Sequence, residues 1–522
     1  MNFKHFPNPS ELEKELISKF PTGKFVGKKK RPERGDDTKV VRASLLRALV
    51  LDQIEGITAD PKGLRLAGAF ITEELELDDS FIRIPLWFSD CLFEKSASLI
   101  DANVPALYLP GCDLPHLNAE RLRCKGDVQL TSSFLARDGV NFRGAEISGQ
   151  LNCNKGTFRS IRGRALNCDA ARIGGDVFLR NEFVAKGEVN FVRARIEGNL
   201  RFEKAKLKGA VSLEAARIGE GLFFREVTGQ VSTLNLTDAS AGVLRDDKKS
   251  WQDAVRSYRL QGFRYDRVDS DMRVHERIEW LETKHDAPLP GFEKHEDPRT
   301  QFAPQPYTWL ASVLQKEGRR QGAVEVRFER EARLAQVAYD RVRHERPVEP
   351  WHDVRLALAA IRFGASKLSR LVFGYGYKPI RALWTVAGIV ALTALLYAQV
   401  YATGQMAPNS DVVLTSADWL AAMRVHEAAG LQPLHVWTGV AEGYDPAPSY
   451  EDYETFSAFL YAVDLFVPLD AIGQETAWAP SKERGIWGTV GYWARLPIQI
   501  SGWVITAVGA AVLTGLVGRD KD

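Results

Sequence analysis

The sequence predicts an all-β right-handed parallel β-helix (a solenoid), followed by a helical region and a C-terminal part with two transmembrane helices. Three observations carry this prediction. A nine-residue unit repeats through the first half, a charged helical stretch follows it, and two uncharged apolar stretches lie near the C-terminus. A fixed repeat is considered first because it decides the architecture.

The repeat has the form Ala-x-Ile/Leu-x-Gly-x-Leu/Val-x-apolar. Regular copies begin at Ala145, Ala171, Ala194 and Ala205, and a copy at Ala216 shifts its glycines by one place. Looser copies begin at Ala69, Ser80, Cys91 and Leu122. Small or apolar residues at every second position indicate short strands with one buried face. A single unit cannot bury that face, so we expect stacked turns of about 22 residues, two units each. An antiparallel sandwich is the alternative, and it does not require a repeated unit.

The repeat domain is expected over 56–245, preceded by a leader and capping helix over 1–55. An open solenoid end is a bare sheet edge that needs a cover, and residues 41–51 have the helical spacing for one. The basic run from Lys28 to Arg31 is interpreted as part of a solvated, partly disordered leader. A nucleic-acid-binding arm is the alternative, but the net charge of only +2 argues against a nucleic acid partner.

The five cysteines all lie in the repeat region, and they are odd in number and without CxxC spacing. We interpret them as small residues facing the solenoid interior. Zinc would require tighter ligand clusters, so no metal site is expected. Such free cysteines are typical of a reducing, cytosolic location.

A helical region is expected over 246–350. Residues 309–339 read as two helices around Gly318, like one helix-turn-helix unit of a TPR array, packed against the end of the β-helix. Residues 251–268 are expected to form a further helix. His275, His285 and His295 lie ten residues apart, but they lack the pair spacing of metal ligands.

Two stretches, 382–402 and 496–518, have the length and apolar character of transmembrane helices. Small residues in the second, from Gly502 to Gly515, favour close helix packing. The region 351–381 is expected to hold an amphipathic juxtamembrane helix on the inner surface of the membrane. Its membrane-surface basic residues would be Arg355, Arg362, Lys367, Arg370, Lys378 and Arg381.

The charge bias predicts the orientation. Basic residues precede the first stretch, whereas the segment 403–495 holds four basic and twelve acidic residues. The positive-inside rule therefore places both termini in the cytoplasm, in a multi-pass protein of the cytoplasmic (inner) membrane, with 403–495 as an outward-facing loop.

Inside this loop, residues 456–472 are apolar but interrupted by Asp464, Pro468 and Asp470. Such a segment is a candidate for a re-entrant loop or a surface helix, and carboxylates at membrane depth would be functional candidates. Thr489, Val490, Gly491 and Tyr492 resemble a potassium-channel filter, but Trp493 stands where that filter has Gly.

Three blocks resemble a group of uncharacterised bacterial membrane proteins: FGYGYKPIRALW (373–384), QPYTWLASVLQKEG (305–318) and YAVDLFVPLDAIGQETAWAP (461–480). In that group a pentapeptide- or bactofilin-like β-helix repeat precedes two C-terminal membrane helices. Some members carry the label "membrane-associated oxidoreductase". The sequence has no dinucleotide, flavin, haem or iron–sulfur motif, so the resemblance implies an architecture and no cofactor.

Three functions are compatible with these observations. The first is a non-catalytic membrane-anchored scaffold or sensor that presents a cytoplasmic β-helix to a protein partner or a second copy, with membrane lipid as the other partner. The second is a pore subunit of span–loop–span layout, regulated by the β-helix. The third, ranked last, is a carbohydrate-active β-helix enzyme, for which Asp78 and Asp79 lack a grouped partner motif. No catalytic residue is predicted.

Overall fold

The computed structural model describes residues 6–282, 302–344, 351–378, 380–467 and 472–513. The chain divides into two compact units, Met1–Glu345 and Arg346–Asp522.

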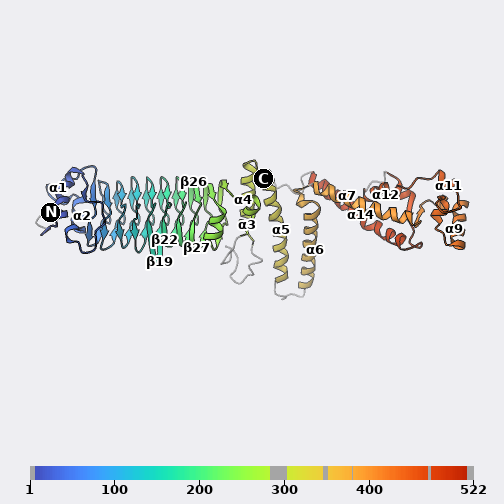
Figure 1. Cartoon of the computed structure of the whole chain (residues 1–522), viewed down its shortest axis with the longest axis horizontal. Coiled ribbons are helices and arrows are strands. Elements are labelled where there is room, and N and C mark those ends of the chain that lie inside the picture. The colour runs from blue at the N-terminus through green and yellow to red at the C-terminus, as the bar shows by residue number, and fades with distance from the viewer. Residues whose placement is uncertain (1–5, 283–301, 345–350, 379, 468–471, 514–522) are drawn as a thin grey trace. The chain divides into compact units, whose positions relative to one another are not determined.

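The first unit is a parallel β-solenoid of about nine turns followed by helices, which confirms the predicted solenoid (Figure 1). Every strand pair in it is parallel, and each strand lies next to its counterpart in the following turn. Between aligned residues of successive turns, the shortest step, from Ala97 to Leu117, takes 20 residues, and the longest, from Thr157 to Val184, takes 27.

Each turn has four faces, which we number in the order the chain meets them. Face 1 comprises β3 (Leu64–Ala67), β6 (Leu86–Ser89), β10 (Leu107–Tyr108), β14 (Val128–Gln129), β18 (Leu151–Asn152), β21 (Val177–Phe178) and β24 (Leu200–Arg201). Face 2 comprises β4 (Phe70–Thr72), β7 (Leu92–Phe93), β11 (Asp113–Leu114) and β15 (Leu135–Ala136). Face 3 comprises β5 (Leu75–Glu76), β8 (Ala97–Ser98), β12 (Leu117–Asn118) and β16 (Val140–Asn141). Face 4 comprises β9 (Asn103–Val104), β13 (Arg123–Cys124), β17 (Glu146–Ile147), β20 (Arg172–Ile173) and β23 (Arg195–Ile196).

Longer strands in the later turns bend from one face to the next. Faces 2 and 3 are joined by β19 (Thr157–Asn167), β22 (Val184–Asn190), β25 (Lys206–Ser212) and β27 (Thr228–Asn235). Faces 4 and 1 are joined by β26 (Arg217–Phe224), β28 (Ser240–Asp246) and β30 (Arg264–Ser270), while β29 (Tyr258–Arg259) pairs with β27.

One nine-residue unit therefore forms half a turn. In the copy that begins at Ala145, β17 lies on face 4 and β18 on face 1, and Gly149 lies at the corner between them. A Cβ at Gly149 would come within 2.7 Å of the backbone of Gly126 in the preceding turn. Only glycine fits such an approach without displacing the backbone, which explains the glycine of the repeat.

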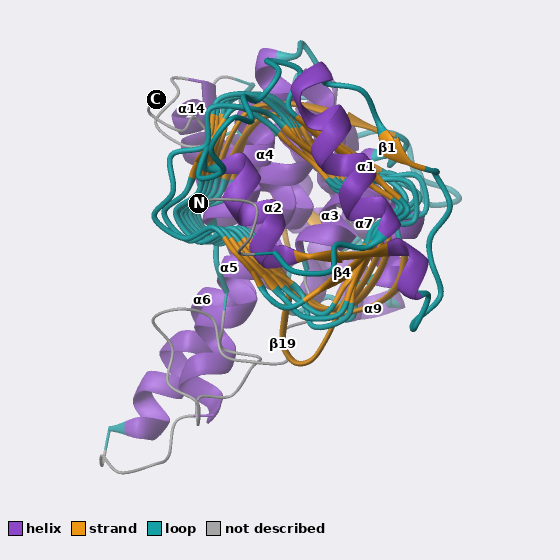
Figure 2. Ribbon diagram, turned by 90° about the vertical axis from the view of Figure 1, so that its left-hand side faces the viewer, coloured by secondary structure: helices purple, strands orange, loops and turns teal. Residues whose placement is uncertain are grey.

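The inward residues form one continuous core. Stacked leucines, valines and phenylalanines fill it, and Figure 2 shows the strands of successive turns superimposed around this interior. All five cysteines are buried in it with free thiols, as the interior-facing interpretation predicts.

The N-terminal end is closed by α1 (Glu11–Lys19) and α2 (Ala43–Val50), which lie across the first turn in Figure 2. Helix α2 falls within the expected capping segment 41–51. The expectation of a partly disordered leader is wrong for residues 6–42. There β1 (Val26–Gly27) pairs with β3, β2 (Val40–Arg42) pairs with β4, and Leu12 and Leu16 are buried.

The expected helix over 251–268 is also wrong. A single π-helical turn at Ser250–Ala254 is followed by β29 and β30, so the solenoid continues to Ser270, beyond the expected boundary at 245. Leu260, Phe263 and Tyr265 are buried as a further turn of the core. Helical spacing in this segment coincides with the inward positions of a solenoid turn, which is why the sequence pattern misleads.

Three helices close the C-terminal end: α3 (Val274–Leu281), α4 (Gln305–Lys316) and α5 (Arg320–His344). Helices α4 and α5 flank Gly318, as predicted for the two-helix unit. The indole of Trp309 donates to the carbonyl of Tyr265 (2.9 Å), and Glu317 accepts from the backbone N–H of Val268 (2.9 Å). The pair therefore packs on the last strand, as expected.

The second unit contains α6 (His352–Val372), α7 (Ile380–Ala402), α12 (Ala458–Phe466) and α14 (Ile486–Leu513). Helix α12 packs against both α7 and α14, which also pack on each other. Between α7 and α12 lie α8 (Asp411–Leu414), α9 (Ala417–Ala429), α10 (Pro433–Trp437) and α11 (Pro448–Glu451), and α13 (Gln474–Ala477) follows α12. Strands β31 (Met406–Pro408) and β32 (Trp478–Pro480) form a small antiparallel pair.

The segment 403–495, expected as an outward-facing loop, is thus folded around a core of its own. Its core contains Trp419, Trp437 and Trp478, each at most 2% exposed, packed around Tyr461 of α12 and Tyr397 of α7. The sequence pattern predicted a loop here and did not indicate this core.

Candidate functional surfaces

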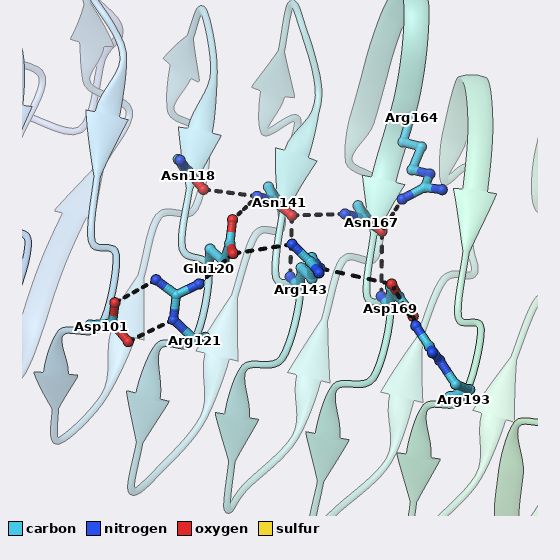
Figure 3. Close-up of polar contacts among 10 residues, drawn as sticks. All are labelled: Asp101, Asn118, Glu120, Arg121, Asn141, Arg143, Arg164, Asn167, Asp169 and Arg193. Atoms are coloured by element: carbon cyan, nitrogen blue, oxygen red, sulfur yellow. Dashed lines mark hydrogen bonds and ion pairs between the residues drawn. The ribbon is translucent and has the colours of Figure 1, made fainter.

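A ladder of alternating charges follows the corner between faces 3 and 4 (Figure 3). Asp101 accepts two hydrogen bonds from Arg121 of the next turn, at 2.8 and 2.6 Å. Asp169 pairs with Arg193 at 3.0 Å and lies 3.9 Å from Arg143. The hydrogen bonds from Arg121 hold the pKa of Asp101 below its ordinary value. Cations and carboxylates thus compensate one another from turn to turn.

A second ladder, of asparagines, lies beside the first one on face 3. The amides of Asn118, Asn141, Asn167 and Asn190 are joined by three hydrogen bonds of 2.9 Å, and Figure 3 shows the first two. Asn190 is fully buried, so the amide chain satisfies polar groups that would otherwise be costly to bury. Both ladders join turns, and neither is a catalytic arrangement.

A shallow groove of about 600 Å³ lies on the outer side of the last turns, where faces 4 and 1 meet. Glycines 219, 221 and 242 line it together with Phe223, and the guanidinium groups of Arg201 and Arg245 lie 4.1 and 4.9 Å from the Phe223 ring. Glu220 and Asp266 also line the groove, so its charge is mixed.

Asp78 and Asp79, the carboxylates considered for a carbohydrate-active enzyme, occupy structural positions in the solenoid. Asp78 accepts from the hydroxyl of Ser98 (2.6 Å) and the backbone N–H of Ile100 (2.8 Å). Asp79 lies in a corner with a φ of 52°. Across the described residues, no group of three or more His, Cys, Asp and Glu side chains could hold a metal ion. His275 is exposed on α3, whereas His285 and His295 lie outside the described residues.

Helix α6 carries an uncovered apolar stripe together with the predicted basic residues. Its exposed apolar side chains recur at helical spacing: Val354, Leu358, Ile361, Leu368 and Leu371 are 49 to 70% exposed. Arg355, Arg362 and Lys367 are exposed on the same helix, and Arg370 is half-buried. Lys378 precedes α7, and Arg381 lies in its first turn. An apolar stripe bordered by cations is typical of a helix lying in a membrane interface.

Helix α7 is, in the described part of the chain, the one helix long and apolar enough to cross a membrane. Only 17% of its most apolar window is buried inside the protein. Helix α14 is also apolar, and Trp493, Leu496 and Trp503 on it are more than 60% exposed. It begins ten residues before the expected span at 496, and residues 514–518 of that span lie outside the described residues.

Part of the segment expected to be re-entrant forms α12, which packs against α7 and α14. Residues 468–471 lie outside the described residues. Beyond them, the side chain of Gln474 accepts from the N–H of Ser457 and donates to the carbonyl of Thr455, just before α12. At the C-terminal end of α12, a Cβ on Gly502 of α14 would come within 1.8 Å of the Phe466 carbonyl oxygen. At 1.5 Å per residue, the nine residues of α12 span about 13 Å, half of a bilayer core.

A polar cluster lies beside helix α12. Asp464 is 4% exposed, and one of its carboxylate oxygens accepts from the N–H of Glu475 (2.8 Å), while the other is buried without a hydrogen bond. The carboxylate of Glu475 pairs with Arg495 (2.8 Å) and accepts from Gln499. The structure therefore brings Asp464 to a buried polar site. Pro468 and Asp470 lie outside the described residues.

The four filter-like residues do not form a filter. Thr489, Val490, Gly491 and Tyr492 lie within helix α14, where backbone carbonyls serve helical hydrogen bonds instead of lining a pore. Gly491 instead lets α14 pack closely on α7, because a Cβ there would lie 3.1 Å from the Val400 side chain. Its carbonyl accepts from the Tyr397 hydroxyl at 2.8 Å.

Sequence reasoning missed the two ladders. It also missed the ion pairs near the solenoid ends, Glu13–Arg42 and Asp246–Arg277. The asparagines were visible as LN or VN pairs and the arginines as charges of regular spacing, but their contacts depend on turn lengths that vary from 20 to 27 residues. Comparison with protein-family models, curated proteins and solved structures finds no match to this chain.

Proposed function

We propose that this protein is a non-catalytic, membrane-anchored scaffold whose β-solenoid presents its lateral faces to a protein partner. The main support for this proposal is that helices close both solenoid ends, while the four faces stay exposed along the turns. A long, regular, side-accessible surface is what solenoid proteins use for binding.

Membrane anchoring is part of the same proposal. Its support is the exposed apolar surface of α7 and α14 and the basic, apolar-striped helix α6 beside them. We propose two membrane-crossing helices in the cytoplasmic membrane, with both termini cytoplasmic, as the charge bias suggests. This is also the architecture implied by the resemblance to the bacterial membrane proteins described above.

Two measurements test this proposal. Carbonate-washed membranes should retain the full chain, and protease added to spheroplasts should cut within 403–495 but not within the solenoid. Cross-linking in intact cells, followed by purification from solubilised membranes, should capture a specific protein with the full chain. A variant lacking 56–270 should lose that partner. Release by carbonate, or an unchanged set of captured proteins, would contradict the proposal.

A pore subunit is the second candidate, and one observation favours it. A short apolar helix packed against two long ones, with a buried carboxylate on it, is an arrangement found where ions or solutes cross membranes. Ion flux in proteoliposomes that Asp464→Asn alters would support it. Liposomes that stay impermeable across the voltages and ligands tried would leave the scaffold as the better account.

A further inference from the structure

Face 2 of the solenoid carries a column of aligned cations. On face 2, Arg159 aligns with Lys186, and Lys186 aligns with Lys208, in three consecutive turns. Lys206 points to the same side from two residues earlier on β25. All four are exposed, and none has an ion-pair partner among the residues that the structure describes.

Aligned like charges in adjacent strands are about 4.8 Å apart and oppose folding. At the corner in Figure 3 the signs of the charges alternate in successive turns. Face 4 carries a second aligned column, Arg172, Arg195 and Arg217, of which Arg172 pairs with Glu146. The acidic side chains near the face 2 column either lie close to other cations or stand at its edge. Glu188 pairs with Arg164 (3.4 Å), Glu226 lies 3.8 Å from Lys204, and Glu182 lies at the corner before β22. The face 2 column therefore lacks the carboxylate compensation seen at that corner.

The basic run near the N-terminus lies on the same side of the solenoid but beside its first turn, where a Cβ at Gly68 would come within 2.1 Å of the Lys28 carbonyl oxygen. The segment after β1 runs along the outside of the stacked turns in Figure 2. Arg31 fixes it there by donating to the carbonyls of Gly111 and Ser133, and it lies 3.8 Å from Asp113 on face 2. Lys28, Lys29 and Lys30 are exposed on this anchored segment. The run is thus held at the corner where face 2 begins.

We propose that face 2 and this anchored segment form one basic docking surface for an anionic membrane. The inference rests on the proposed membrane anchoring, because the anchor keeps the solenoid at high local concentration near the bilayer. Charge favours the same occupant: clusters of four to eight cations bind anionic headgroups. A nucleic acid is the less favoured occupant, because the chain as a whole carries a net charge of only +2.

The test is lysine reactivity of the full chain in nanodiscs of phosphatidylcholine, with or without added phosphatidylglycerol. Acylation rates are read by mass spectrometry. Lys28, Lys29, Lys30, Lys186, Lys206 and Lys208 should react about threefold or more slowly in the anionic discs, and salt should abolish the difference. Lys125, which is exposed after β13 on face 4, is the internal control.

The triple variant Lys186→Glu, Lys206→Glu, Lys208→Glu should lose the protection of Lys28 to Lys30, whereas Lys125→Glu should keep it. Circular dichroism confirms that both variants retain their strands. Equal rates in both lipids, protection that includes Lys125, or stronger protection by added RNA than by lipid would overturn the inference. Failure of the protein to enter the discs would instead contradict the anchoring, so the two failures are distinguishable.

Discussion

At the residue scale, the C-terminal closure depends on one buried ion pair. Asp246, fully buried at the end of β28, accepts two hydrogen bonds of 2.7 Å from Arg277 of α3 and a third from the indole of Trp251. Removing one member of such a pair leaves an unpaired buried charge. Arg277→Met should therefore lower the free energy of unfolding by about 3–5 kcal/mol. The measurement is urea unfolding of the solenoid by circular dichroism.

The double variant Asp246→Leu, Arg277→Met is the control for that interpretation. Because it removes both charges, it should be more stable than Arg277→Met alone. If the double variant loses as much stability as Asp246→Leu and Arg277→Met lose when measured singly and summed, the broken ion pair is not the cause of the loss.

The N-terminal closure uses a similar pair whose strength depends on pH. Glu13 is 1% exposed, and it accepts from Arg42 and from the N–H of Ser10. Burial alone would raise its pKa, but these hydrogen bonds outweigh burial and hold the pKa below the ordinary 4.5. A lowered folded-state pKa gives stability that is fully present above pH 4.5 and is lost as pH falls through the folded value.

Glu13→Gln should thus destabilise the protein by about 1–3 kcal/mol at pH 7, and the gap to the wild type should close in acid. Thermal unfolding between pH 7 and pH 3 measures it. A gap of constant size across that range would show that the charge of Glu13 is not responsible.

At the element scale, the inter-turn contacts are carried by side-chain ladders as well as strands. Asn167 accepts from Asn190 and donates to Asn141, so replacing it leaves two amides in a largely buried row with a missing partner. Asn167→Ala should cost about 1–3 kcal/mol, whereas Asn152→Ala on face 1, outside the ladder, should cost less. Chemical denaturation of both variants decides this. Equal losses would mean that the ladder adds nothing beyond burial.

The same scale shows how far sequence reasoning reaches. The alanine and glycine positions predicted strands, corners and parallel stacking, because each follows from local sterics at one residue. The segment 251–268 misled because one turn of core residues has spacing that also suits a helix. The core built on Trp419, Trp437 and Trp478 was not predictable, since its contacts join residues as far apart in the chain as Tyr401 and Trp478. Asp464 was identified from its sequence context, but the burial of one of its carboxylate oxygens without a hydrogen bond was not.

At the scale of the whole solenoid, both ends are closed against self-association. Helices α1 and α2 with strands β1 and β2 cover the first turn, and α3 to α5 cover the last, so neither presents a bare strand edge. Uncovered edges pair with other chains. This favours lateral docking over end-to-end assembly as the use of the solenoid.

Removal of residues 1–51 should therefore convert the chain into one that associates through its first turn. The exposed strands β3 and β4 would offer free N–H and C=O groups together with apolar core residues such as Leu66 and Ile71. In detergent, light scattering and electron microscopy should show concentration-dependent oligomers of the truncated chain that retain β-sheet circular dichroism. A chain lacking only residues 1–5 keeps both helices and should behave as the full chain does. Should the full chain itself form end-to-end filaments, the helices would be joints and not covers, and the solenoid would act as an assembly element instead of a laterally docking scaffold.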